Sequence, residues 1–364
     1  MKKVLIVIGK LNVGGAEKVG RDIGYYADKT KYEIHYLVFG DEVGTLEPEL
    51  EAVGCIIHHM NSPSSNYVKY WIELWRLLKE NGIDIIHSHT MFNSGWIMLI
   101  GKRLGIPIRI SHSHSIKGME HRKFLKKNYE KIMRKLILKY STKLVACGNG
   151  AGNWLYGEDE FKKRGVLIYN GIGLNEFLFS VEKRSLIRKQ LGLQDKFVIG
   201  HVGHLAPVKN QAFIIEKMPH ILSKKPNAIF LMLGDGADRT MLIKKAKKLD
   251  VEKYLIFTGN VSNVGDFMSA MDVYVFPSLY EGMPLALIEA QANGLPCVIS
   301  DRIPRDVYLT DLIQVLPLEG VDDRWVQQIL KSQRGNSAQY GQKMIDMGFD
   351  RLDMLNKVYS LYEG

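Results

Sequence analysis

Two glutamates eight residues apart form the most informative chemical pattern in the sequence. Glu281 opens the segment Glu-Gly-Met-Pro-Leu at 281–285, and Glu289 follows it. Proline suits the first turn of a helix because it lacks an N–H that would be unpaired there. Free N–H groups at a helix start attract phosphate, and carboxylates accept hydrogen bonds from sugar hydroxyls. This setting favours binding of a sugar phosphate over the alternative of a capping acid and a solvated helix residue.

Two pairs of histidines follow two consecutive apolar runs. His87 and His89 follow the first run, and His112 and His114 lie in the Ser-His-Ser-His-Ser segment after the second. We expect His87 to be a packed strand-end residue, and only one of His112 and His114 to face the ligand if that segment is extended. Four histidines suggest a metal, but no carboxylate or cysteine supplies a third ligand at a recognisable spacing. We therefore expect no metal and no other cofactor.

The net charge of +10 is concentrated in the first half of the chain. Up to Asn170 there are 26 Lys and Arg against 17 Asp and Glu, and after it 23 against 22. Within the first half, Lys117–Lys143 carries ten basic residues, two acids, and apolar residues at helical intervals. Such a segment is typical of a helix on anionic lipid, or of an ordinary surface helix with a core-facing side. Nucleic acid is not expected, because no recognised motif or aromatic platform accompanies the charge.

Composition excludes several classes of protein. Cys55, Cys147 and Cys297 lie far apart, which excludes a disulfide framework and suits a reducing compartment. The apolar run at 4–8 is too short for a signal peptide, and no stretch approaches the ~20 apolar residues of a membrane span. We expect a cytoplasmic protein with peripheral contact at the inner face of the plasma membrane.

Strands alternating with helices must position these residues. Apolar runs predict strands at Val4–Ile8, Ile34–Phe39, Asp84–His87, Ile108–Ser111, Leu144–Cys147 and Val166–Tyr169, and then at Phe197–Val202, Ala228–Leu233, Tyr254–Thr258, Val273–Phe276 and Pro296–Ser300. Helical periodicity is found at Ala16–Lys29, Trp71–Asn81, Gln211–Lys224 and Arg239–Leu249. This alternation is typical of α/β structure with parallel sheets. Two doubly wound, Rossmann-like domains are predicted, 1–170 and 171–364, with an interdomain cleft at the strand ends. The placement of the helices from Arg324 onward is left open, with their return to the first domain as an alternative.

The motifs together resemble the retaining glycosyltransferases of the GT-B fold, the large family four. The Glu-x7-Glu block at 281–289 and the loop ending at Lys209-Asn210 are the specific parts of the resemblance. Weaker matches are Gly14–Glu17, Cys147–Trp154, Tyr169–Ile172, His201–Leu205, Leu233–Gly236 and Phe257–Gly259. The resemblance covers residues 1–310 and implies an acceptor-side first domain and a second domain that binds a nucleotide sugar. Within the family, the sequence is most similar to bacterial enzymes of capsule and exopolysaccharide assembly.

The resemblance implies a role for each matched position. Lys209 would hold the donor diphosphate, Glu281 the donor-sugar hydroxyls, and Glu289 the nucleotide ribose. One of His112 and His114 would be directed at the donor sugar. His204 stands where the family usually has an arginine, so its part in binding phosphate is open. Backbone at the remaining positions would approach the diphosphate and sugar: Gly15, Gly282, Met283, Pro284 and Leu285.

The implied reaction is transfer of a hexose from a nucleotide sugar, with UDP as our first expectation, to a hydroxyl of a saccharide or polyprenyl-diphosphate-linked acceptor. The leaving diphosphate would be stabilised without a metal, since no Asp-x-Asp motif stands at a strand end. Two other reactions stay open: epimerisation or hydrolysis of a nucleotide sugar, and, less favoured because GxGxxG is absent, NAD-dependent oxidoreduction. A binding protein without activity is disfavoured by the joint presence of Lys209, Glu281 and Glu289.

Overall fold

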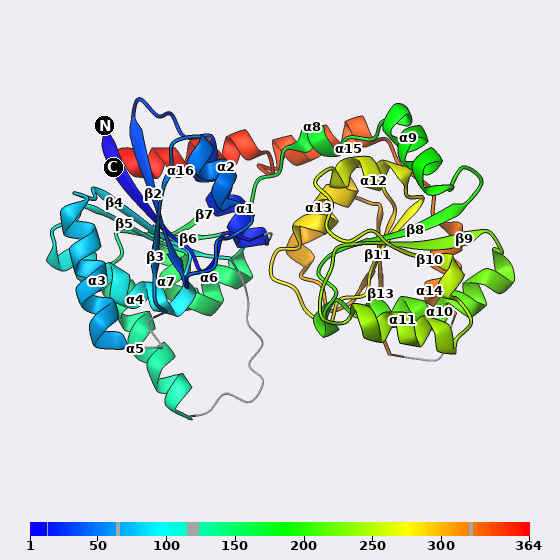
Figure 1. Ribbon diagram of the computed structural model, residues 1–364, viewed down its shortest axis with the longest axis horizontal. Helices are drawn as coiled ribbons and strands as arrows, with labels where there is room; N and C mark the ends of the chain where they lie inside the picture. The colour runs from blue at the N-terminus through cyan, green and yellow to red at the C-terminus, as the bar shows by residue number, and fades with distance from the viewer. Residues whose placement is uncertain (13, 63–65, 115–123, 320–322) are drawn as a thin grey trace. The chain divides into compact units, whose positions relative to one another are not determined.

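The computed structural model describes residues 1–12, 14–62, 66–114, 124–319 and 323–364, and it divides the chain into two compact units (Figure 1). The first unit comprises Met1–Gly171 together with Arg351–Gly364, and the second comprises Ile172–Asp350. The change between units therefore falls one residue after the boundary predicted between residues 170 and 171, and the end of the chain belongs to the first unit.

The first unit is built on a seven-stranded sheet. Its strands lie in the order β3-β2-β1-β4-β5-β6-β7, and every pair is parallel. Their bounds are β1 Lys2–Val7, β2 Tyr32–Phe39, β3 Ile56–Met60, β4 Ile85–Ser88, β5 Ile108–Ser113, β6 Lys143–Ala146 and β7 Gly165–Leu167. Because all the strands point the same way, the residues after β1, β4 and β5 lie along one edge of the sheet.

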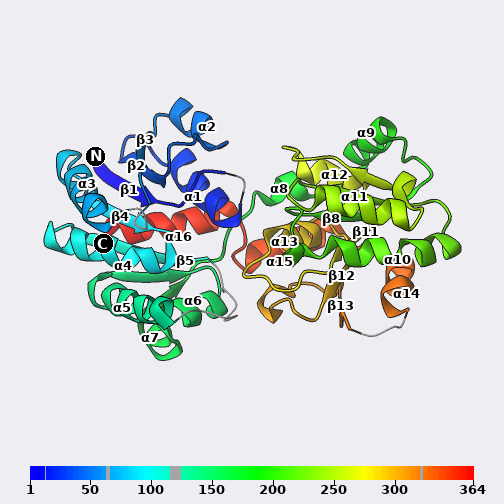
Figure 2. The same cartoon turned by 60° about the horizontal axis from the view of Figure 1, so that its bottom comes forward.

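Helices cover both faces of this sheet. They are α1 Gly15–Tyr25, α2 Glu47–Ala52, α3 Tyr67–Glu80, α4 Ser94–Arg103, α5 Phe124–Tyr140, α6 Asn149–Tyr156, α7 Glu158–Arg164 and α16 Arg351–Glu363, with a short 3-10 turn η1 at Met91–Asn93. Val4 and Ile6 pack into a core with α1 and α16, whereas Leu5 and Val7 pack into a second core with α3 and α4. Alternate residues of β1 thus point into two cores, which is why the strand is apolar throughout. Figure 2 shows α3, α4 and α5 side by side.

The second unit contains a six-stranded parallel sheet in the order β10-β9-β8-β11-β12-β13. Its strands are β8 Phe197–Val202, β9 Ala228–Leu233, β10 Leu255–Phe257, β11 Val273–Phe276, β12 Cys297–Ser300 and β13 Ile313–Leu316. The helices are α8 Leu174–Phe177, α9 Val181–Leu191, α10 Gln211–Lys224, α11 Arg239–Lys248, α12 Val264–Ala270, α13 Leu285–Ala292, α14 Arg324–Lys331 and α15 Ser337–Asp346, with 3-10 turns η2 Pro207–Lys209, η3 Glu252–Tyr254 and η4 Arg305–Val307. The strand order reverses direction at β8 and β11, so the loops after these two strands flank the switch point where α/β sheets bind ligands.

The last helix, α16, is held in the first unit by buried polar contacts as well as by apolar packing. Arg351 forms an ion pair with the fully buried Asp22 of α1, at 3.1 Å. The hydroxyl of Tyr359 donates to the carbonyl oxygen of Ile23 at 2.8 Å. Further along, Tyr362 is fully buried in the core with β1 and β4. α16 therefore completes one face of the first sheet.

Two features of the fold differ from the sequence prediction. β3 and β13 were not expected, because neither is a continuous apolar run: β3 contains His58 and His59, and β13 has Gln314 at its centre. Both strands lie at an edge of their sheet, where one side of the strand faces solvent and polar residues are tolerated.

Among the described residues, none of the helices combines the length and the apolar composition that crossing a membrane requires.

Candidate functional site

Lys209 and Glu281 meet in the second unit, although 72 residues separate them in the chain. The Lys209 ammonium donates to Glu281 Oε1 at 2.7 Å. The lysine side chain is 20% exposed and the glutamate side chain 12%, so the pair is partly shielded but open to a ligand. Lys209 Nζ also lies 5.2 Å from the centre of the Phe276 ring, at the end of β11. The structure thus brings together two of the three charged residues that the sequence predicts for the second domain.

The two loops that carry this pair are joined by backbone contacts. The amide N–H of Leu279, after β11, donates to the carbonyl oxygen of Val208 at 2.8 Å. The side-chain amide of Asn210 donates to the carbonyl oxygen of Pro277 at 3.2 Å. Asn210 itself has a left-handed backbone conformation, with φ of 54°, which asparagine tolerates better than most residues. This turn lets the chain pass from Lys209 directly into α10.

The third predicted acid, Glu289, lies in the middle of α13 and is 6% exposed. Pro284 caps the helix and Leu285 begins it, one residue later than a proline in the first turn would give. Gly294 follows the end of the helix with a φ of 73°, as the sequence predicts. Burial raises the pKa of the neighbouring Tyr274 hydroxyl well above its usual value, and the charges of Glu289 and Glu281 add to the shift. Both carboxylates therefore act on the same buried hydroxyl of β11.

A buried histidine supports the lysine loop, and sequence reasoning missed it. His201 in β8 is fully buried, and its Nδ1 lies 3.0 Å from the carbonyl oxygen of Val275. Burial, with the nearby Lys209 charge, lowers the pKa of His201 to about 4. The neutral ring donates from Nδ1 to that carbonyl and accepts at Nε2 from the side-chain amide of Gln211, at 3.2 Å. The same amide group donates to the carbonyl oxygen of His204 at 3.0 Å, which ties both ends of the loop together.

Close backbone packing explains two glycines after β9. A Cβ on Gly234 would meet the carbonyl oxygen of Gly203 at 2.2 Å, and one on Gly236 would meet that of Leu205 at 2.3 Å. Only glycine allows such an approach.

His204 lies in this packed region, yet its side chain is exposed to solvent. Gly282 and Met283 are half-buried in the loop before α13.

In the first unit, all four predicted histidines form one cluster at the carboxyl ends of β4 and β5, in which His87, His89 and His112 are buried and His114 is half-buried. His87 Nε2 lies 3.1 Å from His112 Nδ1, and His89 Nδ1 lies 2.7 Å from His114 Nε2. Burial lowers the pKa of every member, to about 3 for His87 and about 4 for His114, and well below the usual value for His89 and His112. The imidazoles are therefore neutral at pH 7.

The alternation that would leave only one of His112 and His114 facing the ligand is not observed. Strand β5 extends to Ser113, and the two rings lie on the same side with their centres 4.0 Å apart. Side chains two residues apart on a strand share a face, because only successive side chains alternate. His87 is fully buried, as expected, but it belongs to the same cluster. One signal in the sequence was available: the His-x-His pair recurs 25 residues later, after the neighbouring strand.

The other predicted residue of the first unit is Gly15, which is exposed and begins α1, the first helix after β1. Gly15 and the histidine cluster belong to the carboxyl edge of the first sheet, whereas the Lys209–Glu281 pair belongs to the second unit. Of the basic segment, residues 117–123 lie outside those that the structure describes. Most of the rest forms α5, which ends at Tyr140, and Lys143 begins β6. In α5, Met133 and Ile137 are buried and Lys131, Ile132 and Lys135 are exposed.

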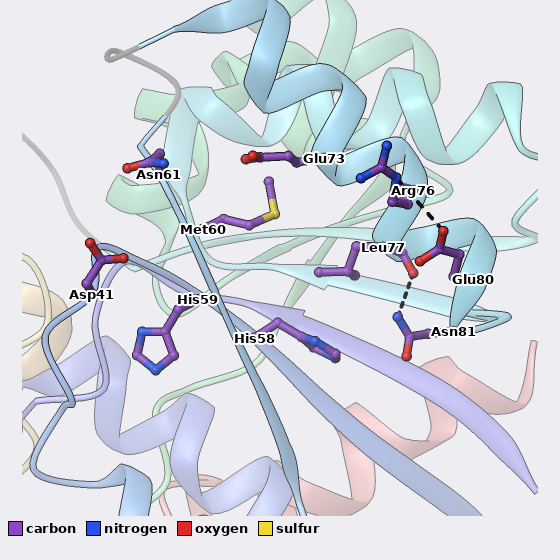
Figure 3. Close-up of a pocket in the computed structure, with 10 residues that line it drawn as sticks. All are labelled: Asp41, His58, His59, Met60, Asn61, Glu73, Arg76, Leu77, Glu80 and Asn81. Carbon is purple, nitrogen blue, oxygen red and sulfur yellow. Dashed lines mark hydrogen bonds and ion pairs between the residues drawn. The ribbon is translucent and has the colours of Figure 1, made fainter.

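A separate cavity of about 320 Å³ lies between β3 and α3 (Figure 3). Polar residues dominate its lining, including Asp41, His58 and Arg76. His58 is connected away from the cavity to His35, whose Nδ1 lies 3.0 Å from His58 Nε2. None of the residues that the sequence predicts for donor binding or catalysis lines this cavity.

Comparison with known proteins identifies the family. Residues 13–176 match the family model described as Glycosyltransferase Family 4, and residues 183–314 match that described as Glycosyl transferases group 1. The protein named "Putative glycosyltransferase EpsF" of Bacillus subtilis (strain 168) is 32% identical over 310 residues, covering 84% of this chain and 81% of that protein.

Two further relatives and one solved structure extend the comparison. The capsular polysaccharide biosynthesis glycosyltransferase CapH of Staphylococcus aureus is 28% identical, with 91% of this chain and 90% of that protein covered. The UDP-Gal:alpha-D-GlcNAc-diphosphoundecaprenol alpha-1,3-galactosyltransferase of Escherichia coli is 32% identical, with 64% and 62% covered. The crystal structure of Anabaena Alr3699/HepE in complex with UDP gives a TM-score of 0.82 at 20% identity, covering 100% of both chains. That likeness shows a shared fold.

Proposed function

Since the chain belongs to the group 1 glycosyltransferases of family four, with the GT-B fold, we propose that it transfers a hexose from a UDP-sugar to a hydroxyl group with retention at the anomeric carbon. The acceptor is a saccharide, free or linked to a polyprenyl diphosphate, in the assembly of a bacterial surface polysaccharide. The single observation that carries the donor assignment is the 2.7 Å contact between Lys209 and Glu281 beside the start of α13.

This pair suits a donor diphosphate because its two members can separate. In the absence of a donor, the carboxylate of Glu281 neutralises the Lys209 ammonium. A diphosphate brings more negative charge to the same ammonium and replaces the carboxylate as its partner. Glu281 then becomes available to accept hydrogen bonds from hydroxyls of the donor sugar. Binding of the donor and release of the sugar-binding carboxylate are thus coupled.

The chemistry of the transfer follows from where charge develops. As the bond from the anomeric carbon to the diphosphate breaks, negative charge grows on the leaving oxygen. Lys209 and the backbone N–H groups of Gly282, Met283 and Leu285, before and at the start of α13, stabilise that charge without a metal at the diphosphate. Glu289 holds the nucleoside through the ribose hydroxyls. No protein base is assigned, since the leaving phosphate can accept the proton of the acceptor hydroxyl.

The names of two proteins support the choice of substrates. UDP is present in the Anabaena complex, and UDP-Gal is the donor in the name of the E. coli relative. That name also gives an acceptor linked to diphosphoundecaprenol, a lipid carried by a membrane. Peripheral contact with an anionic membrane is therefore part of the proposal, and the exposed lysines of α5 provide the charge for it.

A screen of donors tests the proposal first. Thermal unfolding of the full chain is recorded with UDP, GDP, ADP and CMP and with their sugars at millimolar concentration. We expect UDP and a UDP-sugar to raise the melting temperature, because a ligand of the folded state stabilises it by mass action. If no nucleotide or nucleotide sugar shifts the melting temperature, the assignment of the donor site is contradicted. Product analysis with and without a lipid-linked acceptor then separates transfer from epimerisation or hydrolysis.

Two substitutions test the site itself. Lys209→Ala and Glu289→Ala should each reduce transfer by ~10²-fold or more without loss of the fold. Lys245→Ala is the matched control, since Lys245 also pairs with a glutamate of the second unit, Glu216. Wild-type turnover in either of the first two variants would contradict the assignment.

A further inference from the structure

We propose that His87, His89 and His112 form a binding site for a divalent transition metal ion of the Zn²⁺ type in the first unit. The sequence expectation of no metal depended on the lack of a third ligand. The structure supplies that ligand from a neighbouring strand: one ring nitrogen from each of the three imidazoles can be chosen so that all three lie within 4.8 Å of one another. The proposal is independent of the identity of the donor sugar.

The strand pairing explains how three ligands come together. β4 and β5 are adjacent and parallel, with Ser88 opposite Ser111, so His89 and His112 follow as neighbours at the carboxyl end. His87 precedes His89 by two residues and shares its face of the sheet. Both strands are buried, which holds the imidazoles with little freedom. The 3.1 Å between His87 Nε2 and His112 Nδ1 is close to the roughly 3.4 Å between two nitrogens of a tetrahedral zinc site.

An unpaired nitrogen is the second observation. His89 Nε2 is buried and has no hydrogen-bond partner among the residues that the structure describes. A buried polar atom left unpaired destabilises the folded protein, because it has lost its hydrogen bonds to water. Such an atom, within a cluster of neutral imidazoles, indicates that a ligand completes the cluster.

The outer partners fix which nitrogen of His89 is free. The side-chain oxygen of Asn170 lies 3.2 Å from His114 Nδ1 and accepts a hydrogen bond from its N–H, so the neutral His114 ring has no proton on Nε2. That nitrogen then accepts from His89 Nδ1 at 2.7 Å. His89 Nε2 is consequently the bare nitrogen with its lone pair available, which is the form that binds a metal. A metal-ligating histidine usually donates its other N–H to such a partner.

His87 has an equivalent outer partner. Its Nδ1 lies 2.7 Å from the hydroxyl of Tyr362 in α16. With Nδ1–H donated to that hydroxyl, His87 Nε2 carries no proton and accepts from His112 Nδ1. A metal replaces this hydrogen bond and binds both nitrogens, with the proton of His112 moved to its Nε2. Three neutral imidazoles suit Zn²⁺, Cu²⁺ or Ni²⁺ and do not suit Mg²⁺, which prefers oxygen ligands. A site with three protein ligands keeps a fourth position for water or another oxygen ligand.

Metal binding to the full chain tests the site. The protein is purified without a polyhistidine tag, treated with a chelator and desalted, and Zn²⁺ is titrated in competition with a chromophoric chelator. We expect one Zn²⁺ per chain with a Kd of about 1 μM or tighter, and no response to Mg²⁺. His89→Gln and His112→Gln should each weaken binding ~10-fold or more. His220→Gln, which changes a histidine paired with Asp323 in the second unit, should leave it unchanged.

A spectroscopic measurement covers the case in which the variants do not fold. Co²⁺ added to the wild-type protein should give the visible absorption bands of a tetrahedral nitrogen site, and Zn²⁺ should remove them. The proposal is overturned if the wild-type chain binds no Zn²⁺ at 100 μM, or about a hundred times the expected Kd. It is also overturned if both cluster variants bind Zn²⁺ as the wild type does, or if Co²⁺ gives only the weak bands of an octahedral aquo ion.

Discussion

At the scale of single residues, the Lys209–Glu281 pair can separate binding of the nucleotide from transfer of the sugar. Glu281→Gln removes the charge that competes with diphosphate for Lys209, so UDP should bind roughly two- to fivefold more tightly. The same change weakens the hold on the donor sugar, so transfer should fall by ~10²-fold. Calorimetry with UDP and a transfer assay measure the two effects.

A control for this prediction is Glu319→Gln, because Glu319 forms an exposed ion pair with Arg302 in the same unit. It should change neither quantity. Weaker binding of UDP to Glu281→Gln than to the wild type would show that the carboxylate does not compete with the diphosphate.

His201 makes stability depend on pH. Its pKa is about 4 in the folded protein, below the value near 6.5 of an exposed histidine. At a pH between these two pKa values, unfolding of the protein is therefore accompanied by uptake of a proton at His201. The contribution of His201 to the free energy of unfolding is complete above about pH 6.5 and falls as the pH drops toward 4. The loss due to His201 amounts to about 3 kcal/mol at pH 4.

Urea denaturation at pH 7.5 and pH 5 measures this dependence. The buried histidines of the first unit act in the same direction, since burial lowers their pKa values too. His201→Gln keeps a hydrogen-bonding side chain and removes one titrating group, so its midpoint should change less between the two pH values than that of the wild type. An equal change in both proteins would contradict the buried, neutral state of His201.

The sequence reveals the residues that belong to a recognisable motif, and it does not reveal those that only support a loop. Glu281, Glu289 and Lys209 stand in a spaced pattern, and the structure places Lys209 and Glu281 in contact. His201 and Gln211 act by supporting a loop, and a histidine inside an apolar strand carries no signal of that role. Their contact depends on how α10 returns toward β8, which spacing alone does not encode.

At the scale of elements, the strands that are buried on both faces could be predicted from the sequence, whereas strands at the edge of a sheet could not. β8, β9 and β11 have the predicted bounds, because each is central enough in its sheet to be apolar on both faces. β3 has alternating partners: His59 faces Glu47 of α2, at 3.0 Å, while Met60 is buried with α3. Such a strand reads as a polar loop until its neighbours are known.

The contact between α16 and β4 gives a prediction at this scale. Tyr362→Phe deletes the hydroxyl that pairs with His87 Nδ1 and leaves a buried ring nitrogen without that partner. Unfolding free energy should fall by about 1–3 kcal/mol. Tyr340→Phe is a suitable control, since it deletes a hydroxyl that pairs with Asp311 at an exposed position. Thermal or urea unfolding checks both, and equal stabilities would argue against the buried contact.

At the scale of the whole molecule, the placement of the chain's last helix depends on contacts far apart in sequence. Asp22 and Arg351 are separated by more than 300 residues, yet their ion pair is buried in the first unit. An acid in α1 and an arginine near the end of the chain carry no spacing signal that links them. The two α/β units, by contrast, follow from local alternation repeated along the chain, which is why the architecture was the most accessible part of the prediction.

The uneven charge of the molecule gives the last prediction. Helix α5 exposes three lysines, Lys131, Lys135 and Lys139, beside the exposed Ile132. The described part of the basic segment therefore combines positive charge with an exposed apolar side chain. Each lysine near an anionic bilayer contributes about 1 kcal/mol, screened by salt. The wild type should therefore sediment with phosphatidylglycerol vesicles at low salt and not with neutral vesicles. Changing all three to Glu should abolish sedimentation.

The control is the same change at three lysines exposed on α11 of the second unit, Lys244, Lys247 and Lys248. It alters the net charge equally and should leave sedimentation in place. If both triple variants lose binding to the same extent, total charge rather than the surface of α5 governs the contact.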